Sequence, residues 1–111
     1  MILSFKQVDG KVKHIRLKTI SSMPPVTIGR SADATIPLDD NSCSRIHCAI
    51  RYWDDLFVVR DMNSRNGTLL NGEKIRVAVL EPGDVLRVGA TEFCAVAEEG
   101  SRTDVTIMHP E

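Results

Sequence analysis

The stretch "MNSRNGTLLNGEKI", residues 62–75, contains two Asn-Gly pairs that are separated only by residues 68–70. Asn-Gly favours a tight turn because both residues tolerate a positive φ. The segment between the two turns has room for one short strand. Ser64, Arg65 and Asn66 lie at the first turn, so we expect these polar side chains to be exposed together at one edge of the fold.

Short runs typical of β-strands continue on both sides of this stretch. They read "VTIG", "TIPL", "HCAIRYW", "LFVVRD", "DVLRVG" and "TEFCAVA". At the start of the chain, Asp9-Gly10 would join "MILSFKQV" to "KHIRLKTI" as a hairpin. No window keeps the 3.6-residue apolar period of a long helix. Many short strands separated by turns predict an all-β sandwich or barrel.

The composition is typical of one globular domain. The chain has 111 residues, of which 42% are hydrophobic, and a formal net charge of −1. Neither wholesale disorder nor a strong attraction to nucleic acid or to an anionic membrane is expected from these values. The chain has no apolar run long enough to span a bilayer and no signal peptide. We therefore expect a soluble cytoplasmic protein with no membrane partner, with a domain over residues 1–98 and a tail or linker over residues 99–111.

Three regions, residues 29–31, 39–47 and 62–75, carry polar side chains that strand formation does not require. Together they supply three cations, two hydroxyl groups and an amide: Arg30, Arg45, Arg65, Ser44, Ser64 and Asn66. If the regions converge at one end of the fold, they form a small basic pocket rich in donors. Such a pocket suits a phosphate group, which carries about −1.5 to −2 charges and three acceptor oxygens and which guanidinium groups can bind bidentately.

Taken in order, the motifs of these regions resemble the forkhead-associated (FHA) domain, a family that recognises phosphorylated motifs. The matching motifs are Gly29-Arg30, Ser44-Arg45-Ile46-His47, Ser64-Arg65-Asn66-Gly67-Thr68, Asn71-Gly72 and Gly83-Asp84. They cover roughly residues 26–89, and the flanking strands extend the resemblance to nearly the whole chain except the tail. The resemblance implies an FHA/SMAD-like β-sandwich of about eleven short strands in two packed sheets, with the binding loops at one end.

The resemblance also implies contacts with a phosphothreonine peptide. Arg30 and Ser44 match the phosphate contacts of the family, and Arg45 matches a position that often contacts the phosphate or the ligand backbone. Asn66 matches the residue that hydrogen-bonds the main chain of the peptide, and Arg65 occupies the neighbouring contact position.

Other matched positions are expected to shape the site or to select the ligand. Ser42 lies near the position that contacts the third residue after the phosphothreonine. Because Ser42 is small and uncharged, it does not predict which ligand residue is preferred there. The residues expected to support the site are Gly29, His47, Ser64, Gly67 and Asn71.

Several of these residues also have simpler interpretations. Arg65 could be an exposed turn residue, and Ser44 could cap a turn through its hydroxyl. Ser44 and His47 suggest a nucleophile and its base, but residues three apart in an extended segment point to opposite faces. No Cys/His cluster has the spacing of a zinc site. We therefore predict no enzyme, no metal and no cofactor.

Two other functions would use the same features. A nucleic-acid binder could place the three arginines on backbone phosphates, although an aromatic fraction of 5% leaves few rings for stacking on bases. A phospho-independent scaffold could associate through its sheet faces. We favour a non-catalytic module that recognises phosphothreonine in proteins phosphorylated by a Ser/Thr kinase, with no nucleic-acid partner. If Thr103 or Thr106 of the tail were phosphorylated, it could occupy the pocket in cis or in a neighbouring copy and cause self-association.

Overall fold

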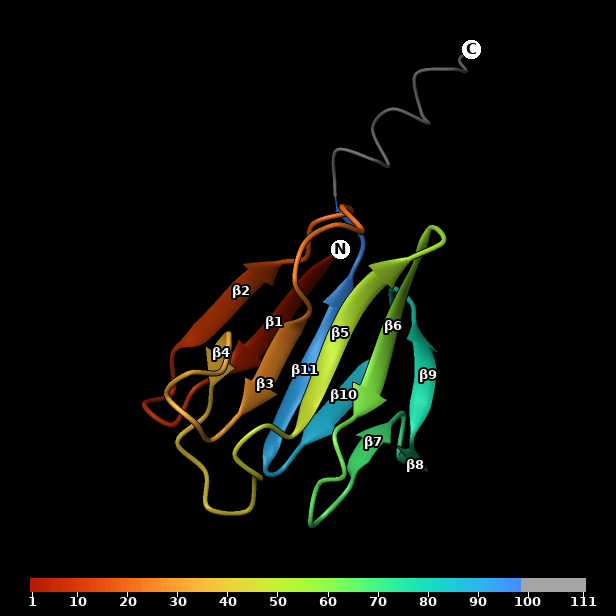
Figure 1. Cartoon of the computed structure of the whole chain (residues 1–111). Coiled ribbons are helices and arrows are strands. Elements are labelled where there is room, and N and C mark those ends of the chain that lie inside the picture. The colour runs from red at the N-terminus through yellow and green to blue at the C-terminus, as the bar shows by residue number, and fades with distance from the viewer. Residues whose placement is uncertain (99–111) are drawn as a thin grey trace.

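The computed structural model describes residues 1–98, which form two β-sheets packed face to face (Figure 1). One sheet has the order β2-β1-β11-β10-β7-β8 and consists of β1 (Ile2–Lys6), β2 (Val12–Arg16), β7 (Thr68–Leu70), β8 (Glu73–Ile75), β10 (Val85–Val88) and β11 (Thr91–Val96). The other has the order β4-β3-β5-β6-β9 and consists of β3 (Val26–Gly29), β4 (Ile36–Pro37), β5 (Cys48–Trp53), β6 (Leu56–Asp61) and β9 (Val77–Leu80). The predicted all-β sandwich of about eleven strands is confirmed.

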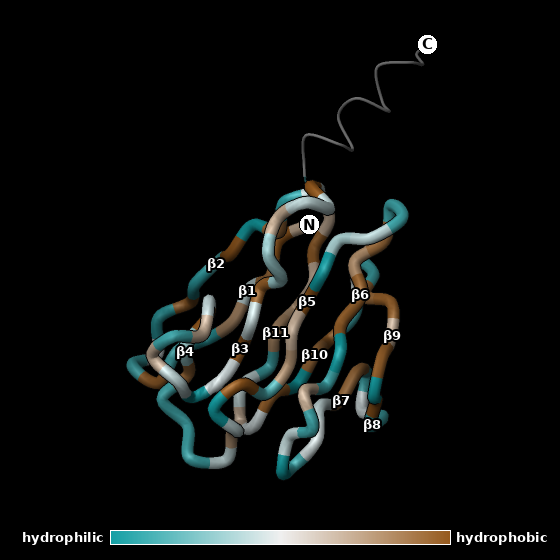
Figure 2. The backbone as a smooth tube through the Cα atoms, in the orientation of Figure 1, coloured by the Kyte–Doolittle hydropathy of each residue, from teal (hydrophilic) through white to brown (hydrophobic). Residues whose placement is uncertain are grey.

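The core lies between the two sheets because successive strand residues point to opposite faces. In β11, Phe93 and Ala95 are buried while Glu92 and Cys94 are exposed. Figure 2 shows this mixture of hydrophobic and hydrophilic residues along the strands. Phe93 packs on Phe5 of the neighbouring β1, with ring centroids 4.6 Å apart. The two aromatic rings thus fill the centre of a core that is otherwise mostly aliphatic.

The structure contains two of the three tight turns predicted from the sequence as hairpin turns. The β1–β2 hairpin turns at Asp9-Gly10 and the β7–β8 hairpin at Asn71-Gly72, as predicted, and both Asn71 and Gly72 have a positive φ, 52° and 86°. The chain also bends at Asn66-Gly67, but only Gly67 of that pair has a positive φ, 86°, and no two-residue hairpin forms there. The reason is topological: residues 62–67 connect β6 to β7, which belong to different sheets and cannot form a hairpin.

Two strands were not anticipated from the sequence. β8 is only three residues long and contains Glu73 and Lys74, and β9 follows it after the single residue Arg76. No glycine or proline separates them, so the usual turn signals are missing. The chain nevertheless changes sheets there, since β8 pairs with β7 and β9 pairs with β6.

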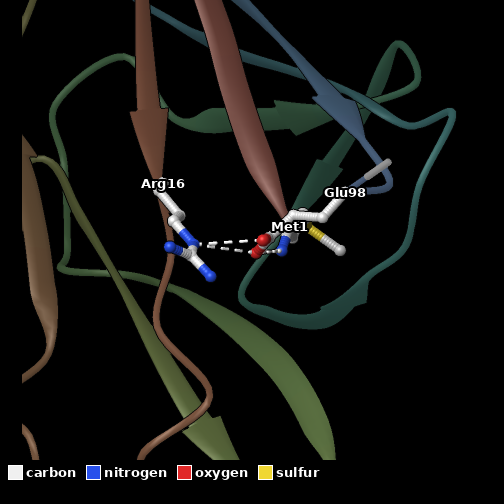
Figure 3. Close-up of polar contacts among 3 residues, drawn as sticks. All are labelled: Met1, Arg16 and Glu98. Carbon is white, nitrogen blue, oxygen red and sulfur yellow. Dashed lines mark hydrogen bonds and ion pairs between the residues drawn. The ribbon is translucent and has the colours of Figure 1, made fainter. Parts of the chain in front are cut away.

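Glu98 ties together both ends of the described chain. The Met1 ammonium group donates to Glu98 Oε2 at 3.0 Å, and Arg16 Nε lies 3.0 Å from Glu98 Oε1 (Figure 3). These contacts connect the start of β1, the end of β2 and the segment after β11. Thr103 and Thr106 lie outside the described residues. Residues 1–98 include no helix of the length and apolarity that crossing a membrane would require.

Candidate functional site

Segments from both sheets meet at the end of the sandwich opposite the N-terminus (Figure 1). Residues 44–47 run beside the end of β3 and its continuation. His47 N donates to Ile28 O at 2.8 Å, and Arg30 N donates to Ser44 O at 3.0 Å. A Cβ on Gly29 would lie 2.8 Å from the carbonyl carbon of Arg45. Glycine at position 29 therefore allows the two backbones to approach closely enough for these hydrogen bonds.

The buried side chain of His47 connects two of these loops. Its Nδ1 accepts a hydrogen bond from Ser44 N at 3.1 Å, so the neutral ring carries its proton on Nε2. Nε2 then donates to Gly67 O at 2.7 Å. The ring thereby holds the segment that contains Ser44 against the loop of residues 62–67, from behind the surface.

Asp61, the last residue of β6, organises the loop that follows it. Its carboxylate accepts hydrogen bonds from Ser64 Oγ at 2.5 Å, from Ser64 N at 3.1 Å and from Thr68 Oγ1 at 2.7 Å. Ser64 Oγ in turn accepts from Gly67 N at 2.9 Å. Burial alone raises the pKa of Asp61, but the hydrogen bonds from Ser64 and Thr68 outweigh it and bring the pKa below its ordinary value.

Asp40 likewise organises the loop of residues 38–47 by accepting hydrogen bonds. Its carboxylate accepts hydrogen bonds from Ser42 Oγ and N and, at 2.7 Å, from Ala90 N in the β10–β11 turn. The hydrogen bond from the Ser42 side chain, followed by that from Ala90 N, lowers the pKa of Asp40 from 3.8 to about 2. Asn66 Nδ2 donates to Ser42 O at 2.9 Å. Three loops are therefore joined around Ser42.

The exposed surface of the site consists of hydrogen-bond donors and cations. Ser44 Oγ accepts a hydrogen bond from Arg65 N at 2.9 Å, which leaves its own hydrogen free to donate outward. Arg30 Nε donates to Cys43 O at 3.2 Å, which orients its guanidinium group. Arg30, Arg45 and Arg65 are exposed, and none of the three forms an ion pair within residues 1–98.

The structure brings together ten of the eleven site residues predicted from the sequence. They share the loops just described: Gly29, Arg30, Ser42, Ser44, Arg45, His47, Ser64, Arg65, Asn66 and Gly67. Asn71 does not contact these loops. Its side chain bonds Asp84 Oδ1 and Val85 N, both at 2.9 Å, and so joins the β7–β8 turn to the segment before β10.

Three residues that shape the site were not assigned to it from the sequence, although a hydrogen bond between Asp61 and the following loop could be anticipated. Asp40 lies two positions before Ser42, and Asp61 lies three positions before Ser64. This spacing favours a local hydrogen bond between the two side chains, but it does not show which other loop the aspartate contacts. Lys74 of β8 lies across Gly67, since a Cβ on Gly67 would be 2.8 Å from Lys74 Cε. Because β8 was not anticipated, nothing in the sequence placed Lys74 near this loop.

This arrangement can bind an anion but offers no activated nucleophile. His47 Nδ1 is occupied by Ser44 N, so it is not positioned as a base for the Ser44 hydroxyl. Burial, reinforced by the charge of Asp40, raises the pKa of the Cys43 thiol to about 11. Within residues 1–98 no three His, Cys, Asp or Glu side chains are grouped to hold a metal ion. What remains is a rigid cluster of donors with three unpaired arginines.

Comparison with known protein families and sequences gives a consistent result. The family model described as FHA domain matches residues 26–89. FhaA of Mycobacterium tuberculosis is 36% identical over 85 residues, which are 77% of this chain and 15% of FhaA. The oxoglutarate dehydrogenase inhibitor of Corynebacterium diphtheriae is 40% identical over 79 residues, which are 71% of this chain and 54% of that protein. The chain thus spans about half, or less, of the length of these relatives.

Solved structures show the same fold. One comes from work described as a structural and functional analysis of phosphothreonine-dependent FHA domain interactions. It has a TM-score of 0.70 and 29% identity, and the match covers 88% of this chain and 98% of that one. The FhaA FHA domain, crystallised in complex with the intracellular domain of Rv3910, also has a TM-score of 0.70, with 32% identity over 83% of this chain and 97% of that one.

Proposed function

This chain belongs to the family of FHA domains, and we propose that it is a non-catalytic module whose loop end binds phosphothreonine in partner proteins. The observation that carries the proposal is that the loops bearing Arg30, Arg45 and Arg65 are hydrogen-bonded to one another around Ser44, through Arg30 N to Ser44 O, Ser31 N to Arg45 O and Arg65 N to Ser44 Oγ. A phosphate group would supply the negative charge that these three guanidinium groups do not find within residues 1–98.

Each exposed residue then has a distinct role. Arg30, Ser44 and Arg45 bind the phosphate oxygens. Asn66, whose Nδ2 bonds Ser42 O, keeps its amide oxygen available to accept from the ligand backbone. Arg65 and Ser42 contact ligand residues beside the phosphothreonine. Because the base is already ordered by Asp40, Asp61 and His47, binding costs little conformational entropy.

The proposed partners are proteins phosphorylated by a Ser/Thr kinase. Two observations on relatives support this proposal. The FhaA FHA domain binds the intracellular domain of another protein, Rv3910, and one related structure comes from work on phosphothreonine-dependent FHA domain interactions. The threonine methyl group would add a preference over phosphoserine. Burying one methyl contributes about 0.8 kcal/mol, which corresponds to a few-fold difference in affinity.

A titration against a degenerate phosphothreonine peptide library, with unphosphorylated and phosphoserine controls, tests the proposal. We expect binding that requires the phosphate. Arg30→Ala should weaken it about 10- to 150-fold, because charge-assisted hydrogen bonds worth roughly 1.5–3 kcal/mol are lost. Lys13→Ala, on β2 of the six-stranded sheet, is the matched control and should leave the affinity unchanged. A folded Arg30→Ala variant with the affinity of the parent would contradict the assignment.

The same titration separates the two rival functions. A nucleic-acid binder that neutralises several phosphates loses affinity steeply with salt, with a slope near −0.9 per phosphate on duplex DNA. A pocket for one phosphate should give a shallow slope. A scaffold would bind its partners equally well with and without phosphorylation.

Self-association through the tail is a further part of the proposal. Peptides that span residues 99–111 with phosphate on Thr103 or on Thr106 can be included in the library. Binding of either peptide, lost in Arg30→Ala, would support occupation of the pocket by the tail. Absence of binding would restrict the ligands to other proteins.

A further inference from the structure

The outward side of β5, β6 and β9 carries an unusual set of side chains. Strand pairing places Trp53 opposite Leu56, Arg51 opposite Val58, and Val58 opposite Val79. Their inward neighbours fill the core, so these residues point to solvent. We call this surface the β5–β6–β9 face. Figure 2 shows the hydrophobic colouring that continues along β9.

Several apolar side chains on this face are more exposed than is usual for the outward side of a sheet. The outward side of an antiparallel sheet is normally polar, but Trp53 is 62% exposed, Val77 48% and Leu56 44%. The six-stranded sheet follows the rule better, with Ser4, Lys6, Arg87 and Glu92 among its outward residues. A hollow of about 470 Å³ lies over the β5–β6–β9 face, lined by Pro25, Ala49, Arg51, Trp53, Val58, Arg60 and Met62. Contiguous exposed apolar surface of this kind marks interaction sites.

Two arginines define the charge of the face. Arg51 and Arg60 project from neighbouring strands at diagonal positions, since Ala49 pairs with Arg60 and Arg51 pairs with Val58. Diagonal neighbours lie about 7–8 Å apart. The outward residues of β5, β6 and β9 include no acid, and neither arginine forms an ion pair within residues 1–98. The face therefore offers two unpaired cations, a fixed distance apart, among apolar side chains.

This charge pattern argues against a second copy as the occupant. Two such faces packed together would bring four arginines into one interface with no outward-facing acidic residue of β5, β6 or β9 to pair with them. The outward side of the six-stranded sheet carries Lys6, Arg16 and Arg87, against Glu92, and is not acidic enough to complement them. Carboxylates that complement Arg51 and Arg60 are therefore best supplied by a partner protein. Residues i and i+2 of an extended strand project to the same side about 6.6 Å apart, which is close to the separation of the two arginines.

We propose that the β5–β6–β9 face is a docking surface for an extended segment of a partner protein in which acidic and apolar side chains alternate. The carboxylates pair with Arg51 and Arg60 while the apolar side chains cover Trp53 and Val58. The contact needs no phosphate and is separate from the loop end.

Trp53 is the only tryptophan of the chain, so its fluorescence reports directly on this face. The probe is an unphosphorylated ten-residue peptide of alternating glutamate and leucine, titrated into the full chain, and a lysine–leucine peptide is the control. We expect the glutamate peptide alone to move the Trp53 emission to shorter wavelength in a saturable way. Arg51→Glu/Arg60→Glu should weaken this binding at least about tenfold and should create a response to the lysine peptide.

Lys6→Glu/Lys13→Glu makes the same change in net charge elsewhere and should respond like the parent. Arg30→Ala should also respond like the parent, since the loop end takes no part. The proposal is overturned if the glutamate peptide leaves the emission unchanged, or if the double arginine variant binds it as the parent does. A shift that depends on protein concentration alone would identify a second copy as the occupant instead. A shift in Val105→Ser/Ile107→Ser/Met108→Ser without any peptide would identify the tail.

Discussion

At the scale of single residues, His47 is buried beneath the proposed binding surface, yet its hydrogen bonds fix the geometry of that surface. Its ring accepts from Ser44 N and donates to Gly67 O, so both ring nitrogens are used and the ring cannot reorient without losing a buried hydrogen bond. Ser44 and the loop that contains Asn66 therefore keep a fixed relation. Gly29 contributes by having no side chain, which leaves room for the backbone of Arg45 and Ile46.

Gly29→Ala is expected to damage both the fold and the site. The added Cβ would clash with backbone atoms of Arg45 and Ile46, and backbone cannot move aside as a flexible side chain can. Overpacking of this kind destabilises proteins by about 1–3 kcal/mol, and the displaced segment carries Ser44. Urea unfolding should show the loss of stability, and titration with a phosphothreonine peptide should show weaker binding.

Gly10→Ala is the control for this prediction. Gly10 has a φ of +87° and no heavy atom within 4 Å of an added Cβ, so the variant suffers backbone strain without a collision. It should lose about 1 kcal/mol of stability and keep its affinity for the peptide. Equal affinity losses in the two variants would mean that the close approach at Gly29 does not position the site.

The site residues could be predicted from the sequence to the extent that they form local motifs. Arg30, Ser44 and Asn66 sit in short motifs whose order along the chain identifies the family, and no long-range information was needed. Lys74 could not be found in this way, because it reaches Gly67 only through the pairing of β7 with β8. Arg51 and Arg60 could not be recognised as a pair either, since their proximity depends on the β5–β6 register.

At the scale of elements, two site loops are held by acidic residues, one at the end of β6 and one in the loop between β4 and β5. Asp61 holds the loop after β6, and Asp40 links the segment before β5 to the β10–β11 turn through Ala90 N. Both carboxylates accept hydrogen bonds from within these loops. Each is surrounded by hydrogen-bond donors, which compensates for placing a negative charge close to a site built for an anion.

Asp40 should make stability depend on pH in the acidic range. Its pKa is about 2 in the folded chain and 3.8 without these contacts, so its contribution is complete above about pH 4 and is lost as the pH falls towards 2. After allowance for solvent screening we expect about 1 kcal/mol. Urea unfolding between pH 2 and pH 7 should show a flatter profile for Asp40→Asn, whereas Asp39→Asn should follow the parent. An unchanged profile in Asp40→Asn would exclude this role.

The elements themselves were predictable where turns are local and unpredictable where the chain changes sheets. The Asn71-Gly72 hairpin follows directly from its two residues, both of which adopt a positive φ. The Asn66-Gly67 pair carries the same signal, but the crossing from β6 to β7 overrides it. Tertiary packing, rather than local preference, decides the conformation there.

At the scale of the whole molecule, the candidate site and the contacts between the ends of the described chain lie at opposite ends of the sandwich. One end carries the loops, and the other is closed by Glu98, which pairs with the Met1 ammonium group and with Arg16. The hydrogen bond from the ammonium group, followed by that from Arg16, lowers the pKa of Glu98. β11 runs from the Ala90 turn to this closure, so one strand connects the loop end of the sandwich to the end at which Glu98 lies.

Truncation tests this division of the molecule. A chain of residues 1–98 should keep the melting temperature and the phosphopeptide affinity of the full chain, because the core and the site loops described above lie within it. A chain of residues 1–96 removes Glu98 and should melt at a lower temperature, although the site, at the other end, should bind as before. Glu98→Gln in the full chain should reproduce that loss by keeping the side-chain shape while removing its charge. A lower melting temperature already in the 1–98 chain would show that residues 99–111 contribute to the folded domain, and the boundary after Glu98 would then be wrong.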